Sequence, residues 1–451
     1  RAWLALATGS LAFVLGTVNV TVTNVGYNDI VQSFPGTGTS LTGWILTGYS
    51  LTFASTMLLA GRLADRYGRL TVFRAGLIGL LISSLAAGLA PSVLLLVVAR
   101  SVQGICGALA VPASLGLVLP RFPIAKQATV VGIWASVGMI ASGLAPVVAA
   151  LALSLANWRW MYLTLVPITA LGLIGAHFFM TETTEQDRSR PLDGLGVAMG
   201  STAVFLMMYA TLRGPSAGWA TPTVVGAFVG ATVLLPLFLR RSARHPEPLF
   251  DPGLFRIRSF AVSNIAVSLS MVGAFTSWAL WPIFLLNVWD YSIWGVGLAF
   301  LVSPTISGAV AIVGGRWADR HGYPGIMAAA AAAATLGHAW AFLFLDERVR
   351  FWFAFFPATV LFGLGMGILA SLLNAAALRD IESKSIATAN GVHQSLRYAV
   401  GGMGVAIGLA VLNGRHDIWR YDTMWLLLGV AQLLVVPLMA LAYPQHRPST
   451  D

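Results

Sequence analysis

The stretch GRLADRYGRL, Gly61–Leu70, places a cluster of charged residues between two long apolar segments of the chain. A second copy, GGRWADRHG at Gly314–Gly322, lies in the other half. Counted from Gly61 and from Gly315, both copies continue with Arg, Ala, Asp, Arg and Gly at the same offsets. A charged turn that recurs at equivalent places in two halves of a chain indicates an internal duplication.

The composition around these turns is that of a polytopic membrane protein. Hydrophobic residues make up 57% of the chain and charged residues 10%, whereas soluble domains average about 45–50% and about 25%. The single cysteine, Cys106, excludes a disulfide framework and a multi-cysteine metal site. The net charge of +10 does not indicate nucleic acid as a partner, because most basic residues fall in loops predicted on one side of the membrane.

A membrane-spanning helix needs roughly 20 mostly apolar residues, and we identify fourteen such segments in the sequence. They are expected near 3–28, 42–62, 70–90, 93–118, 127–152, 158–180, 194–213, 221–240, 258–287, 293–315, 324–345, 351–378, 386–412 and 423–443. The sequence therefore predicts an all-α membrane protein with fourteen transmembrane helices.

The two charged turns would follow the second and the tenth of these helices. This placement predicts an N-terminal six-helix bundle at 1–180 and a C-terminal six-helix bundle at 254–451. Residues 181–253 would hold two linkers and an inserted pair of helices. Two parallel six-helix repeats around a site at the membrane midplane are typical of alternating-access transporters.

The distribution of arginine predicts the orientation. The loops that hold the two charged turns, and those on the same side of the membrane, contain most of the arginines. The positive-inside rule places these loops in the cytoplasm, and an even number of helices then places both termini there as well.

Several motifs resemble one known family. Gly61–Arg69 is similar to the loop motif of the major facilitator superfamily. Arg100, Gln103 and Gly104 fit the R-x-x-Q-G of its fourteen-helix drug:proton antiporter family, and Asn157–Pro167 resembles a further family segment. The resemblance implies the major facilitator fold and multidrug efflux from a bacterial inner membrane. It implies a lipophilic small-molecule substrate, contact with membrane lipids, exchange for protons, no cofactor and no enzymatic activity.

The chain departs from the family pattern in two places. The family motif G-P-x-x-G-G reads Ala145-Pro146-Val147-Val148-Ala149-Ala150. In the first helix, Asn19 stands where the family often has a proton-titrating Asp. Three explanations stay open: coupling runs through Asp29 or a histidine, transport is not coupled to protons, or Asn19 is an engineered substitution that traps one state.

Coupling and gating residues are expected near the charged turns and in the helix at 93–118. Asp65 is expected to accept hydrogen bonds from the free N–H groups at a neighbouring helix N-terminus, as a latch that breaks when the cytoplasmic side opens. Arg66 and Arg69 would pair with acids or lipid phosphate, and Asp319 would act in the second copy. A guanidinium inside the membrane must be paired or hydrated, so Arg100 is expected to bind polar groups near Asn19. The complete set of predicted coupling and gating residues is Asn19, Asp29, Gly61, Asp65, Arg66, Arg69, Arg100, Gln103 and Asp319.

The substrate site is expected to be mostly apolar and aromatic with a few polar groups. The helix at 386–412 carries polar residues at helical spacing, which must face protein or water rather than lipid, and His393 is the second candidate for a proton carrier. The predicted lining residues are Asn19, Thr23, Trp44, Tyr49, Trp134, Asn264, Phe275, Trp278, Trp281, Asn374, Asn390, His393, Gln394 and Arg397.

Other functions are less well supported by the sequence. It lacks G-x-x-x-x-G-K-[ST] and H-E-x-x-H, which argues against ATP-driven transport and against a zinc-dependent intramembrane hydrolase. The main alternative to drug export is a lipid or amphiphile exporter or flippase with weak or no proton coupling. A receptor or scaffold that has lost transport is a third reading.

Overall fold

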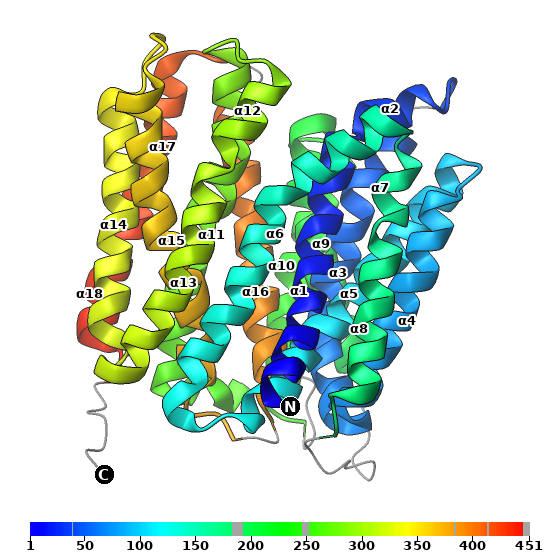
Figure 1. Ribbon diagram of the computed structural model, residues 1–451, viewed down its shortest axis with the longest axis vertical. Helices are drawn as coiled ribbons and strands as arrows, with labels where there is room; N and C mark the ends of the chain where they lie inside the picture. The colour runs from blue at the N-terminus through cyan, green and yellow to red at the C-terminus, as the bar shows by residue number, and fades with distance from the viewer. Residues whose placement is uncertain (38, 183–192, 246–251, 383–384, 413–414, 445–451) are drawn as a thin grey trace.

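The computed structural model describes residues 1–37, 39–182, 193–245, 252–382, 385–412 and 415–444, and these residues are mainly helical. The long helices alternate in direction, so their ends gather in two layers (Figure 1). The helices of the first half, with two short ones, are α1 (Ala2–Val25), α2 (Tyr27–Gln32), α3 (Thr39–Tyr67), α4 (Arg69–Gly88), α5 (Val93–Val118), α6 (Gln127–Leu155), α7 (Arg159–Leu163) and α8 (Leu165–Phe178).

The second half follows an additional pair of helices. That pair consists of α9 (Gly194–Ala217) and α10 (Pro222–Ser242). The helices of the second half are α11 (Arg258–Asn287), α12 (Ile293–Phe300), α13 (Val302–His321), α14 (Tyr323–Phe344), α15 (Phe356–Leu378), α16 (Ile386–Leu412), α17 (Ile418–Leu433) and α18 (Val435–Pro437). Much of the two linkers predicted around the pair lies at 183–192 and 246–251, outside the described residues.

Thirteen helical segments within the described ranges are long and apolar enough to cross a membrane. They account for all the predicted spans except the one at 42–62. The remaining long helix, α3, has 29 residues, but Ser, Thr and Gly recur along its length and lower its hydropathy. By length α3 still suffices to cross a bilayer, since roughly 20 residues are needed.

The charged stretches are largely helical rather than turns. Helix α3 continues to Tyr67 and α13 continues to His321, several residues past the predicted ends at 62 and 315. Gly68 and Gly322 then reverse the chain with φ values of 95° and 83°. Only glycine adopts this left-handed region without a steric penalty, so these two glycines define where the helices end.

The two halves meet along two seams. Helix α6 packs against α13, and α3 packs against α16. In Figure 1 the late helices α14, α15, α17 and α18 lie on one side, and α3, α4, α5 and α8 lie on the other. Helix α9 packs on both α3 and α16, while α10 packs mainly on α9. The inserted pair therefore covers the α3–α16 seam and leaves the α6–α13 seam uncovered by additional helices.

Candidate functional site

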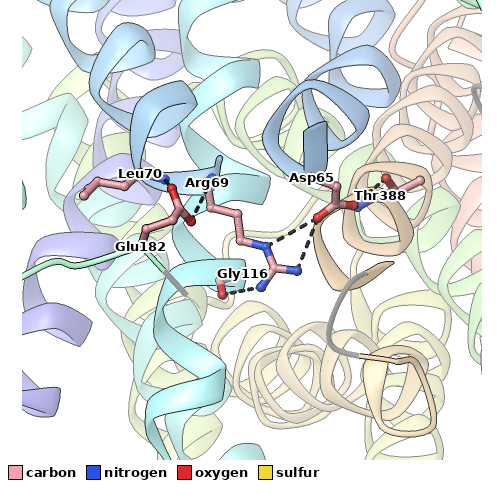
Figure 2. A network of polar contacts seen from close by, with 6 residues as sticks. All are labelled: Asp65, Arg69, Leu70, Gly116, Glu182 and Thr388. Atoms are coloured by element: carbon pink, nitrogen blue, oxygen red, sulfur yellow. Dashed lines mark hydrogen bonds and ion pairs between the residues drawn. The ribbon is translucent and has the colours of Figure 1, made fainter. Parts of the chain in front are cut away.

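Asp65 joins the two halves at the end of the bundle where α3 ends and α16 begins. We call this the arginine-rich end, because Arg62, Arg66, Arg69, Arg121, Arg316, Arg320 and Arg379 lie there. Oδ2 of Asp65 accepts hydrogen bonds from the backbone N–H of Thr388 at 2.8 Å and from its hydroxyl at 2.6 Å. Thr388 lies in the first turn of α16, where backbone N–H groups lack partners within the helix. The carboxylate therefore caps a helix of the opposite half (Figure 2).

Asp319 makes the reciprocal contact from the second half. Its carboxylate accepts hydrogen bonds from the backbone N–H groups of Ala128 at 3.0 Å and Thr129 at 2.9 Å, and from the Thr129 hydroxyl. Ala128 and Thr129 lie in the first turn of α6. Each half thus supplies one carboxylate to a helix N-terminus of the other half, where the positive end of the helix dipole favours a negative charge.

Close backbone approach makes both contacts possible. A Cβ added to Gly315 would lie 2.6 Å from the carbonyl oxygen of Ala128. A Cβ added to Gly391 would lie 2.8 Å from the carbonyl oxygen of Met57 and 3.5 Å from Cα of Gly61. The glycines of the charged stretches therefore lie where helices of opposite halves touch, one turn before each aspartate.

Asp65 also belongs to a second set of contacts within the first half. Its Oδ1 accepts hydrogen bonds from Nε and Nη2 of Arg69 at 3.4 Å and 3.2 Å, and Nη1 of Arg69 donates to the carbonyl oxygen of Gly116 at 2.8 Å. Glu182 accepts hydrogen bonds from the backbone N–H groups of Arg69 and Leu70 at 3.1 Å and 3.0 Å. Glu182 therefore caps α4, and Arg69, which is fully buried, fixes the orientation of Asp65 (Figure 2).

Arg66 makes different contacts from Arg69. Its guanidinium lies 5.2 Å from the ring centroid of Tyr67, and its Nε and Nη1 atoms are buried without a hydrogen-bond partner in the part of the chain that the structure describes. The pairing of Arg66 with an acid or a lipid phosphate stays a prediction.

A polar cluster surrounds Arg100 in the middle of the first half. Nη1 of Arg100 donates to Oδ1 of Asn19 and, at 3.0 Å, to Oε1 of Gln103, and Nε donates to the carbonyl oxygen of Ile45 at 3.3 Å. The guanidinium also lies 4.7 Å from the ring centroid of Tyr49. All of these partners are neutral. Asn19 therefore lies against Arg100, where an Asp would form an ion pair.

A second polar cluster lies on α16. Nδ1 of His393 is 3.2 Å from Oδ1 of Asn264 on α11. Asn390, Gln394 and Arg397 lie on the same helix, and all three are buried. The expectation that these side chains face protein rather than lipid agrees with their burial.

Aromatic rings connect the two halves between these clusters. Tyr49 and Phe53 of α3 have ring centroids 5.6 Å apart. Phe53 lies 5.0 Å from Tyr398 of α16, Tyr398 lies 5.7 Å from Phe275 of α11, and Phe275 lies 5.7 Å from Trp278. Three of the predicted lining residues, Tyr49, Phe275 and Trp278, therefore belong to one aromatic row that crosses the α3–α16 seam.

Other predicted lining residues lie inside one half or against the inserted pair. Trp134 stacks on Phe13, with ring centroids 4.3 Å apart, and Trp281 stacks on Trp425 at 4.5 Å; both rings are buried. Thr23 is hydrogen-bonded to Tyr162. The ring centroids of Trp44 and Tyr209 of α9 are 5.9 Å apart, so Trp44 contacts the inserted pair. Asp29 is exposed on α2, and Asn374 is buried on α15.

Asp193 links the two inserted helices. Its Oδ1 accepts hydrogen bonds from the backbone N–H of Gly196 at 2.8 Å and from Nε and Nη2 of Arg241 at 3.1 Å and 2.7 Å. Burial by itself raises the pKa of Asp193, but the hydrogen bonds from Arg241 and Gly196 outweigh burial and hold the pKa below its ordinary value. Asp193 therefore stays charged at neutral pH and ties α9 to the end of α10.

Sequence reasoning missed the threonines that receive the two aspartates. Ala128-Thr129 is followed by Gly132, and Ala387-Thr388 is followed by Gly391, at the same spacing. This A-T-x-x-G pattern occurs in both receiving helices, but it also occurs at Ala210–Gly214 in α9, so it does not by itself identify them. Glu182 had no such pattern, because its contact depends on how the segment after α8 reaches the start of α4.

Comparisons with known proteins agree with this arrangement. The Methylenomycin A resistance protein of Streptomyces coelicolor is 30% identical over 436 residues, covering 95% of this chain and 89% of that protein. The Puromycin resistance protein pur8 of Streptomyces alboniger is 27% identical, covering 94% of this chain and 84% of that protein. The structure of the proton:xylose symporter XylE has the same fold, with a TM-score of 0.68, 14% identity, and coverage of 98% of this chain and 96% of that one.

The family assignment rests on most of the chain. Residues 4–405 match the family described as Major Facilitator Superfamily. This span includes both charged stretches, the start of both receiving helices and the cluster around Arg100. The chain belongs to the major facilitator superfamily, and it is accordingly a transporter rather than an enzyme.

Proposed function

We propose that this protein is a secondary active exporter of drugs or other lipophilic small molecules, which works by alternating access. The arginine-rich end would face the cytoplasm of a bacterial cell, because the positive-inside rule places arginine-rich loops there. The names of the relatives, which are resistance proteins for methylenomycin and puromycin, support export as the direction of transport.

The reciprocal capping by Asp65 and Asp319 is the observation that carries the proposed mechanism. The two contacts hold the halves together at one end, and both must break before substrate can enter there. Hydrogen bonds to a charged group each contribute about 1.5–3 kcal/mol net. Five such bonds across the seams would strongly favour the closed state, so opening would need substrate binding or a coupled ion to offset them.

Proton coupling is part of the proposal in a restricted form. Asn19 cannot titrate, and α5 and α16 contain neither Asp nor Glu. His393 is buried on α16, whereas Asp29 is exposed on α2. His393 is therefore the candidate proton carrier among the predicted residues.

Counterflow in proteoliposomes tests the proposed function. Liposomes loaded with an unlabelled lipophilic drug should accumulate the labelled drug without any ion gradient, because exchange requires only alternating access. A second measurement imposes a pH gradient on the unmodified protein and on a His393→Gln variant. Absence of exchange for a panel of drugs would reject the export function. Equal responses of the two proteins to the gradient would reject His393 as the proton carrier.

A lipid or amphiphile flippase remains the alternative from the sequence, but the names of the relatives do not favour it. Movement of a fluorescent phospholipid between leaflets, measured in the same proteoliposomes, would distinguish it from export of a soluble drug.

A further inference from the structure

One face of α16 carries buried polar groups that have no hydrogen-bond partner among the described residues. Asn390, Gln394 and Arg397 follow at spacings of four and three residues, which places them on one side of the helix. They are 0%, 0% and 5% exposed. Both amide atoms of Asn390, both amide atoms of Gln394 and Nε of Arg397 are buried without a hydrogen-bond partner. The same holds for both amide atoms of Asn374 on α15.

This concentration of unpaired groups calls for an explanation. In native proteins the large majority of buried polar atoms have a hydrogen-bond partner, and each unpaired one costs about 1–3 kcal/mol. Asn264 on the neighbouring helix, by comparison, has partners for both amide atoms, Phe260 and His393. Other unpaired atoms occur elsewhere among the described residues, but on α16 the amide and guanidinium atoms without a partner all lie on the side that carries Arg397. Helix α15, which carries Asn374, packs on α16.

The position of this face relates it to the transport route. Its first member lies two residues after Thr388, which Asp65 caps at the arginine-rich end. Its last member, Arg397, precedes Tyr398, whose ring lies 5.0 Å from Phe53 and 5.7 Å from Phe275. The unpaired groups thus lie between the Asp65 contact and the aromatic row that joins the halves.

The charge of this region is positive and unbalanced. Arg397 has no carboxylate partner among the described residues. The sequences of α5, α11, α15 and α16 contain neither Asp nor Glu. A buried cation without a counter-charge is strongly unfavourable, and guanidinium groups match carboxylates with two parallel hydrogen bonds. Amide side chains add further N–H donors.

We propose that Arg397, assisted by Asn374, Asn390 and Gln394, binds the carboxylate of an anionic amphiphile, with the aromatic row contacting the apolar part of the same molecule. The substrates of the exporter would then be organic anions rather than cationic drugs. This inference rests on the proposed export function for its physiological meaning. The anion site itself is a binding property that is measured independently of transport.

Three probes that share the dansyl fluorophore test the charge preference. They are dansylglycine, which has a carboxylate; its methyl ester, which is neutral; and a dansylamidoethyl-trimethylammonium salt, which is cationic. The purified full chain in phosphatidylcholine nanodiscs is titrated with each probe and followed by fluorescence. We expect dansylglycine to bind at least about tenfold more tightly than the other two. Equal binding of the three, or preference for the cation, would overturn the proposal without any variant.

An Arg397→Gln variant then assigns the preference to this residue. Loss of one partner of a buried charge pair should weaken dansylglycine binding about 30-fold and the methyl ester less than about threefold. The matched control is Arg420→Gln, which removes the same charge from an ion pair with Asp417 at the opposite end of the bundle; it should leave both affinities unchanged. Unchanged dansylglycine affinity in Arg397→Gln, with the same melting temperature as the unmodified protein, would refute the assignment.

Two further experiments test whether the ligand is a lipid headgroup and whether the bound probes are exported. Adding phosphatidylglycerol to the nanodiscs should not displace dansylglycine; displacement would overturn the assignment to a soluble carboxylate and give the site to a lipid headgroup. Counterflow of the probes in proteoliposomes tests export separately. Anion-selective binding without counterflow of any probe would reject the export function but support the anion site. Counterflow without charge preference would support the export function but reject the anion site.

Discussion

Replacing Asp65 with Asn should shift the protein away from the state that is closed at the arginine-rich end. The carboxylate accepts from Thr388 through one oxygen and from Arg69 through the other. An amide has one acceptor oxygen and one NH2 group, so it can accept from only one of these partners and must present N–H groups to the other. The less costly orientation keeps the bonds to Thr388 and loses those to Arg69.

The magnitude follows from these contacts. Each of the two bonds from Thr388 weakens from about 1.5–3 kcal/mol to about 0.5–1.5 kcal/mol when its acceptor becomes neutral, and loss of the charge at the α16 N-terminus costs about 0.3–1 kcal/mol more. The Asp65 side chain is only 9% exposed, so solvent screens these contacts little. The sum is about 2–4 kcal/mol, which changes the ratio of closed to open protein by roughly 30- to 700-fold.

Spin-label distance measurements detect this shift. In a Cys106→Ala background, labels at Lys126→Cys and Asp380→Cys report the separation of the halves, since both positions are exposed at the arginine-rich end. Asp65→Asn should enlarge the population with a long distance. The control is Asp346→Asn, which makes the same chemical change in an ion pair with Arg350 at the other end. An unchanged distance distribution in Asp65→Asn, or an equal change in the control, would refute the role of the capping contact.

Three further predictions concern other contacts. Asp319→Asn should open the same end. If the two seams open independently, the free-energy changes of Asp319→Asn and Asp65→Asn should add in the double variant, and a double-mutant cycle on the spin-label populations measures any coupling between them. Asn19→Asp should increase the dependence of transport on a pH gradient, and identical pH responses of the two forms would remove this position from the coupling question. Asp193 has a lowered pKa in the folded state, so its contribution to stability is present above its unfolded value of about 3.8 and is lost as the pH falls through the folded value. The melting temperature of Asp193→Asn should lie below that of the unmodified protein at neutral pH, with Arg241 left unpaired, and the difference should disappear in acid.

The sequence predicted features that depend on local composition and on repetition. Apolar segment length indicated the spans, and the repeat at Gly61 and Gly315 indicated two related halves. The hydrogen bonds of Asp65 to a helix N-terminus were expected because the free N–H groups and the dipole at such an end favour a carboxylate. The sequence did not predict that this N-terminus belongs to α16 in the opposite half, since Thr388 is more than 300 positions from Asp65.

The parts that sequence reasoning did not provide depend on how long helices pack. Trp44 and Trp134 are both tryptophans in apolar segments, but one lies against α9 and the other stacks on Phe13 inside the first half. Helical periodicity alone does not distinguish a lipid-facing, a core-facing and a seam-facing position when nearly every residue is apolar. Arg397 was identified as polar and buried, but its lack of a partner became evident only when every neighbouring side chain was placed.

The exchange of carboxylates between the halves has a consequence for biogenesis. The contact of Asp65 with Thr388 joins residues 323 positions apart, and that of Asp319 with Thr129 joins residues 190 apart. During synthesis the first half is complete long before either contact can form. The carboxylate of Asp65 and the free N–H groups in the first turn of α6 therefore stay hydrated until the second half is made. Contacts of such long sequence separation form late in folding. The two halves can therefore insert as independent units, and their docking is a separate final step that co-expressed half-chains should reproduce.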